Sequence, residues 1–149
     1  MKRWIFAICL IPIFFIATDA LSYTESGPAP VYRSTAQIEL SIPLEGYDKE
    51  RVSIALTNEI LRMVSAQYIA KAWSSMQVQE EEIKLRVVAI EAHRIEGSSF
   101  VEIRVDSIDP ILAAKLANAL ADTYISAKEY PAAIIPSIRQ TAKPPSLPL

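Results

Sequence analysis

Apolar and polar residues alternate along residues 33–43 and again along residues 100–106. A period of two gives an extended chain one apolar and one polar face, so both segments are predicted to be half-buried strands. A shorter alternation over residues 88–92 predicts a third strand, which residues 96–99 turn back into the segment 100–106 as a hairpin. The apolar faces consist of Ala36, Ile38, Leu40 and Ile42, of Val88, Ile90 and Ala92, and of Val101, Ile103 and Val105.

Apolar residues recur with the longer period of a helix between the first two strands. Residues 44–47 form a loop, after which Asp48 can cap a helix whose apolar stripe faces the sheet. A second helical segment covers residues 65–76, and glutamates 80–82 open a short third helix that ends near Arg86. Carboxylates in a first turn favour the positive end of the helix dipole, so this acidic run is interpreted as structural rather than as a cation site. The stripe of the first helix is Val52, Leu56, Ile60 and Val64.

The most informative helix follows the strand of residues 100–106. Asp109 supplies an N-cap carboxylate, and Pro110 takes the first helical position, where its missing N–H costs nothing. One side of this helix carries Leu112, Leu116, Leu120 and Tyr124 with Ala113, Ala117 and Ala121, and the opposite side carries Lys115, Asn118, Asp122 and Ser126. The apolar side is predicted to cover the sheet, which leaves the polar side as a candidate interaction face.

The chain after this helix contains several prolines. Tyr130-Pro131 stops the helix, and residues 132–140 form a possible fourth strand that Pro136, which lacks an N–H, confines to a sheet edge. The order of strand, three helices, two strands, helix and possible strand predicts an α/β (α+β) domain. We expect a mixed sheet of three to four strands, packed by the helices. Residues 143–149 are a proline-rich tail, extended or disordered.

An uncharged apolar segment, residues 4–17, follows Lys2 and Arg3. It suits the core of a cleavable signal peptide, whereas a membrane-spanning helix of about 20 residues would have to include Asp19. Both interpretations stay open, and both place the rest of the chain outside the cytoplasm. The chain is therefore divided into a signal-anchor or signal peptide with an apolar helix (1–22), a linker (23–30), a domain (31–142) and the tail (143–149).

Composition narrows the possible partners and chemistry. The chain has 15 basic and 17 acidic residues, a net charge of −2, so we expect no general attraction to nucleic acid. Cys9 is the only cysteine and lies in the leader, which excludes a disulfide framework and a thiolate metal site within one folded chain. The sequence has no glycine-rich phosphate loop, and its one histidine, His93, has no nucleophile placed beside it. We expect no catalytic residue, cofactor or metal ion.

Short motifs follow one another along residues 30–149 in a specific order. The residues that carry them are Tyr32, Ala36, Ser65, Ile103, Asp109, Pro110, Ala113, Ala117, Asn118, Tyr124 and Pro144. In this order the chain resembles the N-terminal domain of bacterial polysaccharide chain-length determinants, the Wzz-type co-polymerases. Residues 138–148 are similar to the proline-rich segment that precedes a second membrane helix in this family.

The resemblance implies a membrane-proximal periplasmic module of the bacterial inner membrane. Members of the family associate with themselves and set the length of a surface glycan (O-antigen, capsule or exopolysaccharide) through a separate polymerase or export complex. The family continues the helix after its Asp-Pro into a long helical arm, whereas Pro131 is expected to end the helix early here. The alternative is a free periplasmic binding or adaptor domain, soluble after signal cleavage, that shares only the fold.

Overall fold

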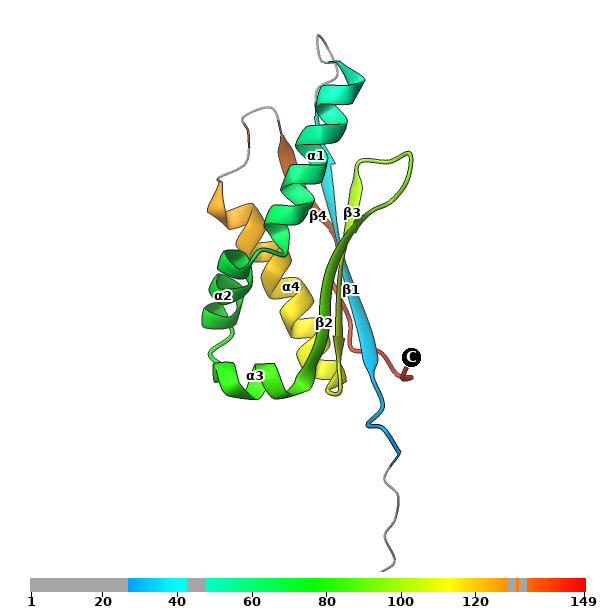
Figure 1. The fold of residues 1–149 in the computed structure, drawn as a ribbon, viewed down its shortest axis with the longest axis vertical. Helices are drawn as coiled ribbons and strands as arrows, with labels where there is room; N and C mark the ends of the chain where they lie inside the picture. Colours follow the sequence, from blue (N-terminus) through cyan, green and yellow to red (C-terminus); the bar gives the residue numbers. More distant parts are fainter. Residues whose placement is uncertain (1–26, 43–47, 129–130, 132–133) are drawn as a thin grey trace, which may run out of the picture.

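The helices and strands follow the predicted order (Figure 1). The computed structural model describes residues 27–42, 48–128, 131 and 134–149. The predicted apolar helix of the leader, most of the linker and the loop 44–47 lie outside these described residues. The elements are β1 (Tyr32–Ser41), α1 (Lys49–Met63), α2 (Ala66–Ser75), α3 (Glu80–Arg86), β2 (Val87–Arg94), β3 (Phe100–Ser107), α4 (Pro110–Ala127) and β4 (Ile135–Gln140).

The strands form one sheet in the order β2-β3-β1-β4, and every neighbouring pair is antiparallel. The α+β class is confirmed, but the sheet is not mixed as expected. The helical connection from β1 to β2 does join strands of the same direction, yet β3 lies between them. In the same way α4 joins β3 to β4 across β1. Two such split βαβ units interleave into a ferredoxin-like order, which leaves no parallel neighbours.

The helices cover one face of the sheet, and the core lies between these two layers (Figure 1). Ala36 of β1 and Ile103 of β3 are register partners, and both are fully buried beneath the helices. The predicted apolar side of α4 is buried along its length. Its buried residues are Leu112, Ala113, Ala114, Leu116, Ala117, Leu120, Ala121 and Tyr124. Since burying one leucine contributes about 1.5–3 kcal/mol, this helix and the central strands form the most strongly stabilised part of the domain.

The buried side of α1 differs from the predicted one. Leu56 is buried as expected, but the other buried positions are Glu59 and Met63, while Ile60 and Val64 are only half-buried. The reason is the position of the helix, which contacts β2 at the margin of the sheet and also α2 and α4. Its deepest side therefore faces the other helices as much as the sheet.

The apolar face of β2 also departs from the prediction at one residue. Ile90 and Ala92 pack against the core as expected, but Val88 is exposed. The register between β2 and β3 shifts between Val87 and Ala89. A bulge inserts an extra residue, which changes the side of the sheet to which neighbouring side chains point. Strict alternation therefore fails at the first residues of β2.

The C-terminal part of the chain is ordered along the edge of the sheet. β4 is an edge strand, as the proline predicted, and Pro136 lies opposite Leu40 of β1. Beyond β4 the tail is extended rather than disordered. The hydroxyl of Ser34 donates to the carbonyl of Lys143 (2.9 Å), and the N–H of Leu149 donates to the carbonyl of Val31 (2.7 Å). We call residues 141–149 the C-terminal strap.

Both chain ends of the described domain lie at one end of the sheet. Val87 and Tyr32 are both register partners of Ser107, so this row also contains the junctions α3–β2 and β3–α4. We call the row formed by Val87, Ser107, Val31 and Leu149 the proximal end. At the opposite, distal end Ser41 of β1 pairs with Ile135, where β4 begins. None of the helices in the described part of the chain has the length and hydropathy of a membrane span.

Candidate functional site

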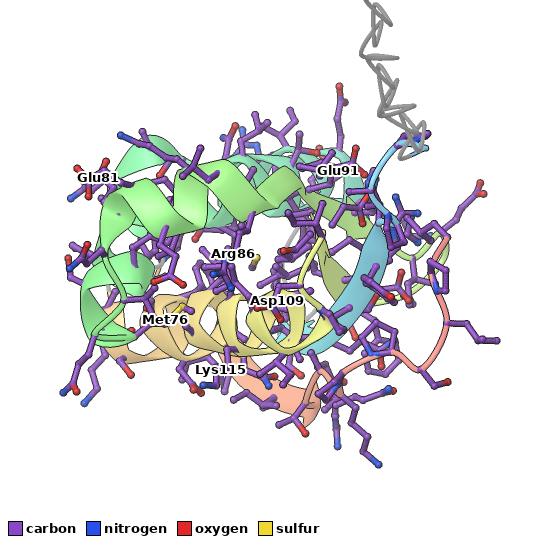
Figure 2. The ribbon with its side chains drawn as sticks, turned by 90° about the horizontal axis from the view of Figure 1, so that it is seen from below. Met76, Glu81, Arg86, Glu91, Asp109 and Lys115 are labelled. Carbon is purple, nitrogen blue, oxygen red and sulfur yellow. The ribbon has the colours of Figure 1, made fainter. Side chains whose placement is uncertain are left out.

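The polar side of α4 forms one wall of a shallow groove, and α2 forms the other. Lys115, Asp122 and Ser126 are exposed there, as the sequence predicted. Two adjoining hollows of about 490 and 350 Å³ follow the line between the two helices. Their lining residues are Lys71, Ser75 and Met76 on the α2 side and Lys115, Asn118, Ala119, Asp122, Thr123, Ser126 and Ala127 on α4. Met76 and Lys115 both lie along α4 in the view from below (Figure 2).

The groove is lined by charged side chains of both signs and by hydroxyl groups. It presents the ammonium group of Lys115, the carboxylate of Asp122 and the hydroxyl groups of Ser75 and Ser126, and its apolar lining includes two alanines. Lys71 also lines it, and its ammonium group lies 5.3 Å from the centroid of the Tyr68 ring. Both charge signs occur side by side, so the groove suits hydrogen bonds to a polar partner more than the capture of a strongly charged one.

Asn118, the fourth predicted contact residue, is not a free surface group. Its side-chain amide donates to the carbonyl of Ala142 (3.0 Å), and its side-chain oxygen accepts the N–H of Ala142 (2.7 Å). This two-point contact is the kind that a neighbouring strand would make, and it leaves Ala142 buried. Asn118 therefore holds the C-terminal strap against α4 while it also lines the groove, and its contact with a partner stays a prediction.

A buried carboxylate, which the sequence interpretation missed, lies between α1, α2 and α4. Glu59 accepts a hydrogen bond from the hydroxyl of Tyr124 (2.8 Å) and two from the guanidinium of Arg62 (3.1 and 3.2 Å). Burial raises the pKa of the Tyr124 hydroxyl far above its ordinary value, and the Glu59 carboxylate raises it further. Tyr124 thus donates this bond as a neutral phenol. The signal was visible in the sequence, because Leu56, Glu59 and Met63 share one side of a helix.

The junction between β3 and α4 is held by polar contacts at the proximal end. Asp109 caps α4 as predicted, accepting from the N–H groups of Ile111 (2.9 Å) and Leu112 (3.1 Å). The guanidinium of Arg86 also donates to its carboxylate (3.0 Å), and both residues lie near the centre of Figure 2. The bond from Leu112 and, to a smaller extent, those from Ile111 and Arg86 lower the pKa of Asp109 against the opposing effect of partial burial. This carboxylate stabilises the fold by capping α4.

The acidic run of residues 80–82 opens α3, as predicted. Glu80 pairs with Lys84 (2.6 Å) and Glu82 pairs with Arg86 (2.9 Å), each four residues later on the helix. Such pairs stabilise a short helix by about 0.2–0.5 kcal/mol each. Within the residues that the structure describes, no group of three or more His, Cys, Asp or Glu residues is placed to hold a metal ion.

Charged residues on the face of the sheet away from the helices are paired with one another. Arg33 donates two bonds of 2.7 Å to its register partner Asp106, and Arg104 pairs with Glu102 (2.6 Å). Glu39 and Arg139 form a third pair. His93 is exposed, and its ring contacts Glu91 (2.8 Å). These pairs leave this face close to neutral.

The residues that carry the family resemblance lie mostly in structural positions. Ala36, Ile103, Ala113, Ala117 and Tyr124 are in the core, Asp109 and Pro110 begin α4, Ser65 precedes α2, Tyr32 opens β1, and Asn118 and Pro144 belong to the contact between α4 and the strap or to the strap itself. These motif residues therefore describe how the domain is built, and the groove is one of its accessible polar surfaces. The chain matches no model of a known protein family and no curated protein.

Proposed function

We propose that this domain is a non-enzymatic envelope protein that takes part in determining the chain length, or the export, of a bacterial surface polysaccharide. It acts through contacts with itself and with a polymerase or export complex, from the periplasmic side of the inner membrane. The proposal begins from the order of short motifs along the sequence, which resembles that of the chain-length determinants. The groove between α2 and α4 is the surface that we assign to these contacts.

The observation that supports this proposal most is the position of the chain ends. The bond between Leu149 and Val31 brings the strap back to the point where the linker from the apolar leader joins β1. In a module held near a bilayer, the linker to the membrane should join the domain at one end. The surface that contacts other proteins should lie clear of that end. α4 runs from the proximal end toward the distal end, so its polar side extends away from the linker.

One observation favours the alternative, a periplasmic adaptor that shares only the fold. α4 ends at Ala127, and Lys128 has a left-handed backbone conformation (φ 50°) that stops the helix. The long helical arm of the chain-length determinants therefore does not continue from this helix. A reduced accessory subunit of a glycan export system and a free adaptor are both consistent with this ending.

The test compares surface glycans in four bacterial strains. Deletion of the gene is expected to change the length distribution or the amount of exported polysaccharide while synthesis of the repeat unit continues. The double reversal Lys115→Glu with Asp122→Lys is expected to change the same profile without unfolding the domain, because exposed charges contribute little to stability. An unchanged gel ladder in the deletion strain overturns the chain-length function and favours the adaptor.

The matched control exchanges another exposed pair of charges outside the groove. Glu80→Lys with Lys84→Glu also preserves net charge, and both side chains are more than half exposed on α3. This variant is expected to leave the glycan profile at that of the wild type. A similar change in both double variants would mean that the groove is not the contact surface.

The fate of the leader separates the two functions further. We predict that residues 1–22 are retained as an anchor, because a contact-based regulator of a membrane polymerase must stay near the bilayer. Intact-mass measurement of the protein isolated from bacterial membranes is expected to show the full chain. A mature N-terminus at Leu21 or Tyr23 in the soluble periplasmic fraction would contradict the anchor.

A further inference from the structure

Large apolar side chains are exposed in a group at the proximal end. Leu85 is 82% exposed at the end of α3, and Ile111 is 55% exposed in the first turn of α4. The others are Val88, Ile108, Leu147 and Leu149. We call these six residues the apolar end. Elsewhere in the described chain, the exposed large apolar residues are Ile54 and Leu61 on α1 and Ile135 and Ile138 on β4.

Backbone hydrogen bonds and strand register place the apolar end in one row. The N–H of Ile108 donates to the carbonyl of Arg86 (3.0 Å), which brings Leu85 and Ile108 to neighbouring positions. Ser107, the residue before Ile108, is opposite Tyr32, and Leu149 is bonded to Val31. The row therefore runs across the full width of the sheet, from α3 to the strap. Figure 2 looks onto this end of the domain, with Arg86 and Asp109 near its centre.

The length of chain before β1 indicates what covers the apolar end. The uncharged segment of residues 4–17 is joined to Val31 by residues that include Gly27, Pro28 and Pro30. The linker 23–30 can reach at most about 26–29 Å when fully extended. A leader inserted in the bilayer would therefore hold the proximal end within that distance of the lipid headgroups, whereas the distal end would lie a sheet length farther away.

The two basic residues of α3, next to the apolar end, are paired within the domain. Lys84 pairs with Glu80, and Arg86 pairs with both Glu82 and Asp109. Such a surface has little net attraction for anionic lipid, so its contact with a membrane must come from the apolar side chains. Moving leucine and isoleucine side chains out of water lowers the free energy, whatever the charge of the lipid.

We infer that the apolar end rests on the bilayer that carries the leader and inserts its leucine and isoleucine side chains among the lipid headgroups. The domain then stands with one end of its strands on the membrane and the strands pointing away from it. The groove between α2 and α4 faces sideways, along the membrane surface. This inference goes beyond the glycan function and does not depend on it, but it rests on the proposal that the leader is retained as an anchor. It predicts a contact that is insensitive to salt and to anionic lipid.

The test uses the full chain isolated from bacterial membranes and reconstituted in phosphatidylcholine vesicles that contain a nitroxide-labelled lipid. Cys9→Ser removes the native thiol, and a polarity-sensitive dye is attached to a single new cysteine. L85C and I111C report on the apolar end, while I54C and L61C on α1 are the controls. Ile54 and Ile111 are 56% and 55% exposed, so this pair is closely matched for solvent access.

The dye at residues 85 and 111 is expected to be quenched by the nitroxide several-fold more than the dye at residues 54 and 61. The difference is expected to persist in about 1 M salt, where the Debye length is only about 3 Å. Equal quenching at all four positions overturns the inference, as does quenching that salt abolishes. A dye that is shielded from water at residue 85 but not quenched by lipid would show a protein partner instead, and would also overturn it. If the leader is cleaved, the mature protein is mixed with the same vesicles, and the same outcomes decide.

Discussion

The two long helices of the domain bury very different surfaces. α4 lies over the central strands β1 and β3 and buries leucine and alanine along its whole length, with Tyr124 near its end. α1 lies over the edge strand β2 and buries a carboxylate, Glu59, between Leu56 and Met63. A helix over the middle of a sheet meets apolar atoms along its whole stripe. A helix at the margin meets other helices, where a polar residue can be satisfied by their side chains.

The largest difference between the helices is expected in apolar truncations. Leu116→Ala on α4 removes a fully buried side chain and should lower the free energy of unfolding by about 2–5 kcal/mol. Leu61→Ala on α1 changes a residue that is 64% exposed and should stay within about 0.5 kcal/mol of the wild type. Urea denaturation of both variants measures this, and similar midpoint shifts would contradict the difference in burial between Leu116 and Leu61.

The same contrast explains how much of the fold the sequence predicted. The stripe and cap of α4 depend on residues within or next to one helix, and Asp109, Pro110 and Leu116 are each read from local spacing. The burial of Glu59 depends instead on how α1 meets Tyr124, which is 65 residues away in sequence. The role of Asn118 depends on Ala142, which is 24 residues away in sequence and belongs to the C-terminal strap.

The groove was only partly predictable for the same reason. The exposed positions Lys115, Asp122 and Ser126 follow from helical periodicity, because they are opposite the buried leucines. The second wall of the groove, with Ser75 and Met76, follows only from the packing of α2 against α4. Antiparallel pairing throughout the sheet was likewise beyond local patterns, since it depends on β3 entering between β1 and β2.

The next largest effect tests the polar contact that joins the two helices. Tyr124→Phe removes one hydrogen bond to the Glu59 carboxylate and should cost about 1.5–3 kcal/mol, as for other bonds to charged groups. Glu59→Gln should also destabilise the domain, because Arg62 loses its charged partner. In a double-mutant cycle the two changes are expected to couple by about 0.5–3 kcal/mol. Additive effects in chemical denaturation would show that this bond does not link α1 and α4.

The caps of the two helices provide a smaller comparison. Asp109 accepts two backbone bonds and one from Arg86, whereas Asp48 accepts a single bond from Glu50 (3.2 Å) at the start of α1. Asp109→Ala should therefore cost up to about 2 kcal/mol, and Asp48→Ala about 0.5 kcal/mol. Equal shifts of the denaturation midpoint would contradict this difference in capping.

The contribution of Asp109 should also depend on pH. Its pKa in the folded domain is lower than the ordinary 3.8, so the folded state favours the ionised form. The stability that Asp109 adds is therefore complete well above pH 3.8 and is lost as the pH falls through the lowered pKa. The difference between wild type and Asp109→Asn should shrink between about pH 5 and pH 2, and a difference that grows on acidification would reverse the sign argued here.

The smallest effect concerns the polar sides of the helices. Asn118 makes two hydrogen bonds to the backbone of Ala142, whereas Asn58 is exposed on α1. Asn118→Ala should cost only about 1 kcal/mol overall, because water can replace part of what is lost at this half-buried position. Its local effect should be larger, since Ala142 and the strap would lose their attachment to α4. Limited proteolysis followed by mass spectrometry is expected to remove residues 141–149 faster in Asn118→Ala than in Asn58→Ala. Equal cleavage rates would mean that the strap is held by its contacts with Ser34 and Val31 alone, and that Asn118 serves the polar interaction face predicted from the sequence.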